Sequence, residues 1–246
     1  MARAASGVTL SLGRGEVLGV VGESGSGKSS VAMSVPRLLP SPPAFWPGGR
    51  VLFDGRDTLT MPLGELRRLR GRRIGVVFQD PMGSLSPLHR IGDQLVETVR
   101  LHMDVSARAA RAQALGWLAK VGIPDPAVRA QAYPHELSGG MQQRVMIAMG
   151  LMLEPDLLIA DEPTTALDVT IQAQVLKLMK ALHRANSAVL LITHDLGVVS
   201  QLATRLAVMC AGRVVETADD PAAFFANPQH PHSKALVAEA RRMELE

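Results

Sequence analysis

A glycine-rich segment that ends in a lysine and a serine is the first feature of this sequence that could perform chemistry. Residues 22–29 read GESGSGKS and match the pattern G-x-x-x-x-G-K-[ST]. The glycines allow the backbone to curl so that successive N–H groups point at phosphate oxygens. Lys28 would place a positive charge near the outer phosphates of a nucleotide, and the Ser29 hydroxyl could ligate Mg²⁺. The segment therefore predicts a site for a nucleoside triphosphate and its magnesium ion.

The predicted nucleotide-binding set consists of this loop and the serine that follows it. An alternative interpretation is a glycine- and serine-rich turn with an incidental lysine. The context favours a binding loop, because the segment follows an apolar, strand-like run at 17–21 and precedes a helical pattern. The members of the set are Gly22, Glu23, Ser24, Gly25, Ser26, Gly27, Lys28, Ser29 and Ser30.

Two adjacent carboxylates follow another apolar run. Residues 157–160 read LLIA, and Asp161 and Glu162 come directly after them. Ligands of open α/β sheets collect at the carboxyl ends of the strands. Asp161 could therefore hold Mg²⁺ through water, and Glu162 could polarise the water that attacks the phosphate. The alternative is an acidic turn that simply meets solvent, which Pro163 would suit.

Gln79 and His194 also stand at the ends of predicted strands, at 74–78 and 189–192. The Gln79 amide could reach Mg²⁺ or the attacking water, and His194 could contact a γ-phosphate. The residues alone leave a structural role open for both, as a polar strand-end amide and a satisfied histidine.

A second potential anion site lies at Ser138, Gly139 and Gly140. Ser138 can cap the helix that follows, and the glycines leave the N-terminus of that helix open. One nucleotide cannot easily contact both the phosphate loop and the Ser138 helix start of a single chain. This pattern therefore suggests that one chain completes the site of another. The alternative is an ordinary capped helix.

The elements that must position these residues alternate between strands and helices. Buried strands are predicted at 17–21, 74–78, 157–160, 189–192 and 206–208, and a helix with one apolar face at 171–183. This alternation predicts an α/β fold around a largely parallel sheet. The stretch from 80 to 154 differs, because it contains only helical patterns, at 91–101, 107–121 and 140–153.

Composition narrows the class of protein. The 246 residues are 47% hydrophobic and 20% charged with a net charge of +3, as expected of a folded globular chain. Aromatic residues are 3%, too few for base-stacking platforms, and the single cysteine, Cys210, excludes a disulfide framework and suits a reducing compartment. The sequence shows neither a spanning apolar run nor the apolar core of a secretory signal. We therefore do not expect an integral membrane protein, a secreted mini-protein or a coiled coil.

The order of these motifs resembles the ATP-binding subunits of ABC transporters. The resemblance implies a single ABC ATPase domain over residues 1–246, with a P-loop NTPase fold. A RecA-like core, 1–79 and 155–246, would carry an inserted helical signature subdomain, 80–154. The motifs are Walker A at 22–29, the Q-loop at Gln79, the signature at 137–141, Walker B at 157–162, the D-loop at 166–168 and the H-loop at His194.

The resemblance also implies roles for individual residues. ATP and Mg²⁺ would be the cofactors, and ATP hydrolysis coupled to transport would be the activity. Catalysis would fall to Glu162, His194 and Gln79, and Mg²⁺ to Ser29, Gln79 and Asp161. Ser138, Gly139 and Gly140 would contact, in trans, the nucleotide held by the partner subunit.

A narrower resemblance is to the oligopeptide, dipeptide and nickel importer branch, and within it to the D-type ATPase. Residues 137–149, 160–170 and 227–231 carry it. It implies two permease subunits, a second ATPase of the F type, an extracytoplasmic solute-binding protein and no nucleic acid. The chain would sit peripherally on the cytoplasmic face of the inner membrane and energise import of peptides, nickel or metal chelates.

Three departures from the family pattern stand out. Position 141 is methionine where the general signature has glutamine, although this branch commonly has methionine. No aromatic residue precedes Gly22 to stack on adenine, so either the true start lies upstream or adenine is held less tightly. No cysteine follows Cys210, whereas many peptide-type members carry a C-terminal cysteine cluster.

Two other functions use the same motifs. One is a soluble accessory ABC ATPase of a cytoplasmic enzyme complex, such as a carbon–phosphorus lyase type assembly. The other is a nucleic-acid-associated ABC ATPase, which would need long coiled coils or two ATPase domains in one chain. Neither of those features fits in 246 residues.

Overall fold

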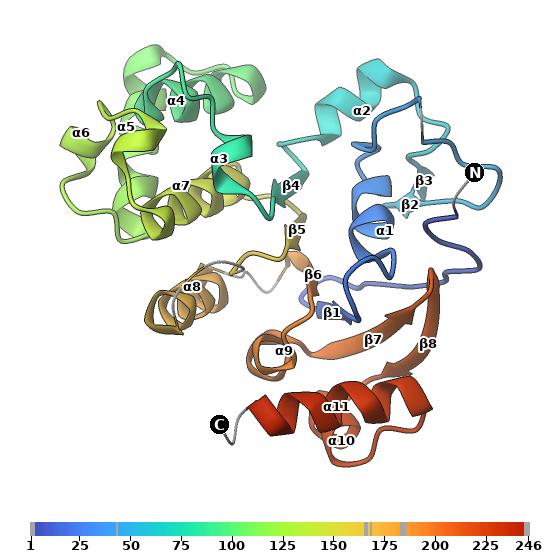
Figure 1. The fold of residues 1–246 in the computed structure, drawn as a ribbon. Coiled ribbons are helices and arrows are strands. Elements are labelled where there is room, and N and C mark those ends of the chain that lie inside the picture. Colours follow the sequence, from blue (N-terminus) through green and yellow to red (C-terminus); the bar gives the residue numbers. More distant parts are fainter. Residues whose placement is uncertain (1–2, 43, 165–166, 168, 183–185, 244–246) are drawn as a thin grey trace. The chain divides into compact units, whose positions relative to one another are not determined.

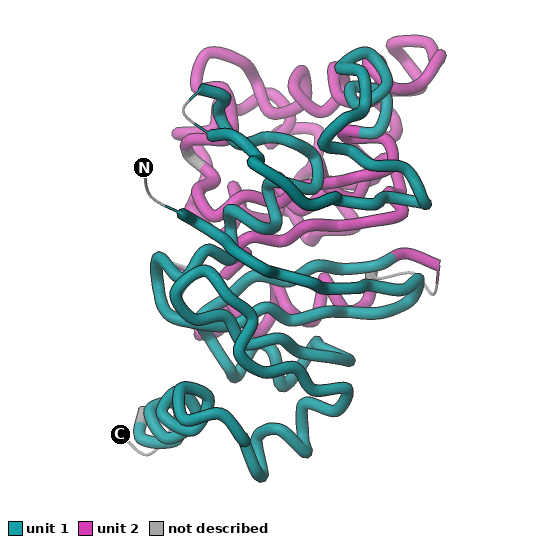
Figure 2. The backbone as a smooth tube through the Cα atoms, turned by 90° about the vertical axis from the view of Figure 1, so that its right-hand side faces the viewer, with its two compact units in different colours: residues 1–69, 188–246 teal, residues 70–187 magenta. Residues whose placement is uncertain are grey.

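The chain folds into two compact units, seen in a computed structural model that describes residues 3–42, 44–164, 167, 169–182 and 186–243. Unit 1 contains residues 1–69 and 188–246, and unit 2 contains residues 70–187 (Figure 2). The helical segment predicted at 80–154 lies within unit 2, together with the strands that precede and follow it. Among the described helices, none is long and apolar enough to cross a bilayer.

The main sheet of unit 1 contains strands β6, β1, β7 and β8, in that order (Figure 1). Strand β1 (Val17–Val21) lies between β6 (Ala188–Thr193) and β7 (Arg205–Cys210) and runs parallel to both. Strand β8 (Arg213–Ala218) pairs antiparallel with β7. The three parallel strands are almost continuously apolar because both of their faces are buried.

The helices of unit 1 bury one side of this sheet. The core cluster joins Val21 of β1 and Leu206 of β7 to Val199, Phe224 and Val237, which come from three later helices. Asp195 and Asp220 cap two of those helices by accepting hydrogen bonds from backbone N–H groups. The remaining elements of unit 1 are α1 (Lys28–Ser34), β2 (Leu52–Phe53), β3 (Arg56–Asp57), α2 (Leu63–Leu69), α9 (Leu196–Leu202), α10 (Pro221–Ala226) and α11 (Pro231–Met243).

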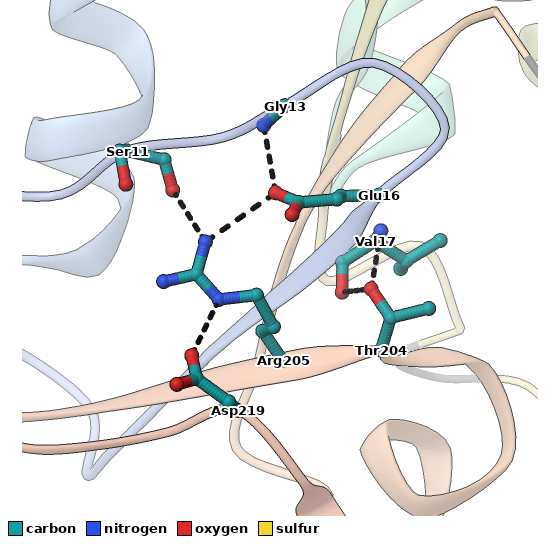
Figure 3. Close-up of polar contacts among 7 residues, drawn as sticks. All are labelled: Ser11, Gly13, Glu16, Val17, Thr204, Arg205 and Asp219. Atoms are coloured by element: carbon teal, nitrogen blue, oxygen red, sulfur yellow. Dashed lines mark hydrogen bonds and ion pairs between the residues drawn. The ribbon is translucent and has the colours of Figure 1, made fainter.

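A polar cluster fixes the chain just before β1 (Figure 3). The Arg205 guanidinium donates to Asp219 Oδ1 at 2.9 Å, and to Glu16 Oε2 and the Ser11 carbonyl at 3.3 Å each. The hydrogen bond to Asp219 and the Glu16 carboxylate raise the pKa of Arg205, so the group stays charged. The cluster therefore ties the entry to β1 to strands β7 and β8.

Unit 2 combines a parallel strand pair with helices. Strand β4 (Ile74–Val77) pairs with β5 (Leu157–Asp161), placing Val77 opposite Ala160. Gly75 and Gly150 permit close approach of the helix that packs on β4, since a Cβ at Gly75 would lie 2.2 Å from the Gly150 carbonyl oxygen. The helices are α3 (Pro81–Ser84), α4 (Ile91–His102), α5 (Ala107–Lys120), α6 (Pro126–Arg129), a 3₁₀ turn (Pro134–Glu136), α7 (Gly139–Leu151) and α8 (Val169–Leu182).

All five predicted strands are present, with ends that differ by up to two residues from the predictions. Helix α8 begins at Val169, two residues before the predicted start, and the predicted end at His183 lies outside the described residues. The sequence pattern did not reveal β2, β3, β8, α2 or the helices after β6. Apart from the 13-residue helix α11, these elements span two to seven residues, too short for a clear apolar period.

Candidate functional site

The phosphate loop of unit 1 has a backbone that only glycine can follow. Gly22 has φ 150°, and a Cβ there would lie 2.1 Å from the Met209 carbonyl oxygen. Gly27, with φ 98°, stands immediately before α1. Both positions fall outside the φ range open to other residues, so the glycines fix the path of the loop between β1 and α1.

Lys28 is held inside this loop. It is only 4% exposed, and its Nζ donates to the carbonyl oxygens of Gly22 at 2.7 Å and Glu23 at 2.8 Å. The loop backbone thus wraps around the ammonium group. This places the positive charge of Lys28 within the loop that is predicted to bind the phosphates.

Ser26 provides an independent test of fit to an anion. Its side chain is buried, yet its Oγ has no hydrogen-bond partner among the described residues. A buried hydroxyl without a partner loses the free energy of a hydrogen bond, which a phosphate oxygen could restore. Ser24, Gly25 and Ser29 are exposed on the loop and accessible to a ligand. These residues fit a nucleotide with its metal.

His194 leaves the sheet beside the phosphate loop. Val21, the last residue of β1, pairs with Thr193, the last residue of β6. Gly22 and His194 therefore follow adjacent parallel strands at the same edge of the sheet. His194 is exposed there, and Asp195 accepts hydrogen bonds from Gly197 and Val198 at the start of α9. Unit 1 thus brings the phosphate loop and His194 to one edge.

Unit 2 joins two other predicted site residues directly. Gln79 follows β4 and Glu162 follows β5, and Gln79 Nε2 donates to Glu162 Oε2 at 3.1 Å. Asp161, the last residue of β5, is 7% exposed. Glu162 has φ 46°, a left-handed conformation that costs a non-glycine residue about 1–3 kcal/mol. Gln79 and Glu162 therefore lie side by side where two paired parallel strands end.

The predicted signature loop opens helix α7. Ser138 is the N-cap, and its Oγ accepts the Met141 N–H at 3.4 Å, as the sequence predicted. Ser138 and Gly139 are exposed, so the first turn of α7 is accessible. Ser138, Gly139 and Gly140 lie in unit 2 with Gln79, Asp161 and Glu162. Ala166 and Asp168 of the predicted D-loop lie outside the described residues.

Two polar contacts were not singled out from the sequence, one beside Glu162 and one elsewhere, in unit 1. Gln143, 1% exposed, donates to the Pro163 carbonyl directly after Glu162. In unit 1, the Glu216 carboxylate accepts the N–H groups of Gln229 and His230. The signal for Gln143 was a polar residue within an otherwise apolar helix. The signal for Glu216 was the 227–231 run, which supported the family resemblance but was assigned no role.

Comparison with known proteins identifies the family. The sequence profile described as ABC transporter matches residues 5–165, more than half of the chain. This chain belongs to the ABC transporter family. The match includes the phosphate loop, Gln79, the signature loop and the carboxylates Asp161 and Glu162.

Individual relatives are similar over nearly the whole chain. It is 53% identical to the probable peptide ABC transporter ATP-binding protein y4tR of Sinorhizobium fredii, over 96% of this chain and 70% of that protein. It is 48% identical to the oligopeptide transport ATP-binding protein OppD of Bacillus subtilis, over 98% and 68% respectively. The dipeptide transport ATP-binding protein DppD of the same organism is 49% identical, over 99% and 72%.

Solved structures confirm the fold class, an α/β P-loop NTPase of the ABC ATPase kind. The ATP-binding cassette MJ0796, in a dimeric post-hydrolysis state with ADP and phosphate, matches with a TM-score of 0.77 and 30% identity, covering 87% of this chain and 89% of that one. CbiO1 of Clostridium perfringens, described as part of the ABC transporter complex CbiONQ, matches with a TM-score of 0.74 and 30% identity, covering 91% and 84%.

The predicted function is thereby confirmed. The chain is an ATP-binding and ATP-hydrolysing subunit of an ABC importer, and these relatives do not favour the alternative of a soluble accessory ATPase. Membership of the family implies permease subunits as partners and, with them, association with a membrane.

Proposed function

We propose that this ABC ATPase energises import of peptides, with the phosphate loop of unit 1 binding ATP and Glu162 of unit 2 acting as the base for hydrolysis. The observation that carries the assignment within the chain is the hydrogen bond from Gln79 Nε2 to Glu162 Oε2. It joins two polar side chains at the ends of paired parallel strands, the edge of an α/β sheet where ligands bind.

Each residue of the site then has a defined task. The loop amides and Lys28 bind the phosphates, and His194 contacts the γ-phosphate. Glu162 accepts a proton from the attacking water, whose oxygen bonds to the γ-phosphorus while the bond to the bridging oxygen breaks. Ser29, Gln79 and Asp161 would hold Mg²⁺, which neutralises charge on the β- and γ-phosphates when bound. Hydroxyl, amide and carboxylate oxygens suit that hard cation.

The signature loop serves the other half of a dimer in this proposal. Ser138, Gly139 and Gly140 contact the ATP held by a second ATPase subunit, a distinct F-type paralogue. The exposure of Ser138 and Gly139 at the start of α7 supports this role, since an open helix N-terminus suits an anion. The dimeric form of the similar cassette MJ0796 also supports it.

The further partners follow from the branch of the family. Two permease subunits would form the path through the membrane, and an extracytoplasmic solute-binding protein would deliver the solute. The chain would lie on the cytoplasmic face of the inner membrane. Relatives that are described as peptide, oligopeptide and dipeptide transport proteins support peptides as the solute, ahead of nickel or metal chelates.

Two substitutions test the division between binding and hydrolysis. Glu162→Gln should leave ATP binding intact and lower turnover by ~10²–10⁴-fold, the usual contribution of a general base. Lys28→Ala should weaken ATP affinity by at least ~10-fold, because it removes charge-assisted contacts to the phosphates. Normal turnover in the first variant, or unchanged affinity in the second, would contradict the assignment.

A pull-down tests the assembly. The tagged chain would be recovered from its native membranes in mild detergent, and bound proteins identified by mass spectrometry. We expect two permeases and a second ATPase, whose associated binding protein can then be titrated with peptides, nickel and metal chelates. Recovery of soluble enzymes without a membrane subunit would overturn the importer assignment.

A further inference from the structure

We infer that Gln143 is a positioning residue for the catalytic carboxylate, an inference that rests on the proposed role of Glu162. Gln143 lies in the second turn of α7 and is 1% exposed. Its Nε2 donates to the backbone carbonyl of Pro163 at 2.5 Å. The helix that begins with the signature loop is thus bonded directly to the backbone that follows Glu162.

The backbone at this point needs to be held. Glu162 has φ 46°, a left-handed conformation that a residue with a Cβ adopts only where surrounding structure imposes it. Pro163 follows, and its ring fixes its own φ. A hydrogen bond that anchors the Pro163 carbonyl therefore restrains the peptide that directs Glu162. Gln143 supplies that bond from inside the fold, where water cannot replace it.

The support behind Gln143 is itself rigid. Helix α7 packs closely on β4, where a Cβ at Gly75 would lie 2.2 Å from the Gly150 carbonyl oxygen. The same strand leads to Gln79, whose amide holds the Glu162 side chain at 3.1 Å. Glu162 is therefore held twice, by Gln79 at its carboxylate and by Gln143 through the backbone after it.

This arrangement predicts a specific kinetic defect. Loss of the Gln143 amide should let the Glu162 carboxylate shift from the attacking water without touching the phosphate loop of unit 1. A misplacement of about 1 Å can lower a rate by ~10²-fold. The defect should appear in kcat and not in ATP affinity, as expected for a group that acts only on the chemical step.

The experiment uses the complete chain in the complex in which it purifies. Gln143→Leu removes the amide at similar volume, and Gln143→Glu keeps the shape but turns an oxygen toward the Pro163 carbonyl. Both should lower kcat by ~10–100-fold while ATP affinity stays within ~2-fold. An unchanged kcat in both folded variants would overturn the inference.

Gln113→Leu is the matched control. Gln113 Nε2 donates to the Met152 carbonyl at 2.8 Å, which is the same kind of bond at the other end of α7. This variant should lower the melting temperature, as the Gln143 variants do, and keep kcat within ~2-fold of wild type. An equal loss of kcat in Gln113→Leu would show that general loosening of α7 is responsible, and would overturn the inference.

A double substitution separates this inference from the proposed function. If Gln143 acts through Glu162, then Gln143→Leu should not lower the residual turnover of Glu162→Gln any further. If the two substitutions lower turnover by factors that multiply, Gln143 acts independently of Glu162. Normal turnover in Glu162→Gln alone would instead refute the proposed base. A large loss in Glu162→Gln combined with wild-type kcat in the Gln143 variants would refute only the positioning role.

Discussion

Units 1 and 2 present their candidate functional residues in the same way but hold them by different means. Each has a pair of adjacent parallel strands whose carboxyl ends carry candidate residues: β1 and β6 in unit 1, β4 and β5 in unit 2. Unit 1 offers mainly backbone, a loop wrapped around Lys28. Unit 2 offers side chains held by other side chains, as Glu162 is by Gln79. Binding and hydrolysis should therefore be separable by substitution.

The largest effect is expected at Gly22. Gly22→Ala would impose a Cβ 2.1 Å from the Met209 carbonyl oxygen at a φ of 150°. Both the collision and the dihedral oppose the loop, so we expect a stability loss of about 2 kcal/mol or more, with loss of ATP binding. Denaturant unfolding and ATP titration measure these changes. Gly25→Ala is the control for dihedral strain without collision, since a Cβ there meets nothing within 4 Å.

In unit 2, glycines allow close packing, and two neighbouring glycines should differ in the stability lost when each is replaced by alanine. A Cβ at Gly75 would lie 2.2 Å from a backbone oxygen, so Gly75→Ala should cost ~1–3 kcal/mol. At Gly150 the nearest atom is a Val77 methyl at 3.0 Å, which can shift. Alanine also favours the helix by ~1 kcal/mol over glycine, so Gly150→Ala should be close to neutral. Equal losses in denaturant unfolding of the two variants would contradict close packing at Gly75.

A pH-dependent effect is expected where Glu216 anchors the segment before α11. Burial would raise the pKa of Glu216, but hydrogen bonds, including those from the Gln229 and His230 N–H groups, outweigh it and lower the pKa below its ordinary value of 4.5. The carboxylate therefore stabilises the fold above that value, and the stabilisation is lost as pH falls through the lowered pKa. Glu216→Gln should cost ~1–2 kcal/mol at pH 7.

The role of Glu216 is tested by the pH dependence of the difference in unfolding free energy between wild type and Glu216→Gln. Chemical unfolding of wild type and Glu216→Gln at a series of pH values should show two stabilities that converge in acid. A difference that persists unchanged well below pH 4 would mean that the charge of Glu216 does not support the segment.

The smallest effect is expected in the cluster at Arg205. The Arg205 side chain is 30% exposed and its partner Asp219 is 89% exposed, so solvent screens the pair. Arg205→Met should cost about 1 kcal/mol or less, and the loss should shrink in high salt. Urea unfolding at low and high ionic strength measures it. Asp219→Asn is the control and should cost less still, because Glu16 and the Ser11 carbonyl remain as acceptors.

The sequence indicated the candidate site residues more clearly than the elements that support them. The phosphate loop, the two carboxylates and the capped helix at Ser138 were recognisable because their residue types and spacing are dictated by chemistry with a nucleotide. All five buried strands were found because both of their faces are apolar. Strand β8, with Arg213 and Glu216 among its residues, was not predicted, since half-exposed strands lack that pattern.

Contacts between distant residues could not be predicted. Nothing local indicates that Gln143 reaches the Pro163 carbonyl, because that bond depends on how α7 packs against the strand pair. The 227–231 run was visible, but its anchoring depends on Glu216 of strand β8, more than ten residues away. The left-handed backbone at Glu162 is likewise a consequence of tertiary structure, since sequence gives no reason for it.

The most direct test of the division between binding and hydrolysis identifies the nucleotide that stays bound to a trapped protein. Glu162→Gln would be incubated with ATP and Mg²⁺, separated rapidly from free nucleotide, and its bound nucleotide resolved by chromatography. Our account predicts intact ATP on Glu162→Gln, ADP on wild type, and little nucleotide on Lys28→Ala. Recovery of ADP from Glu162→Gln at the wild-type rate would contradict it.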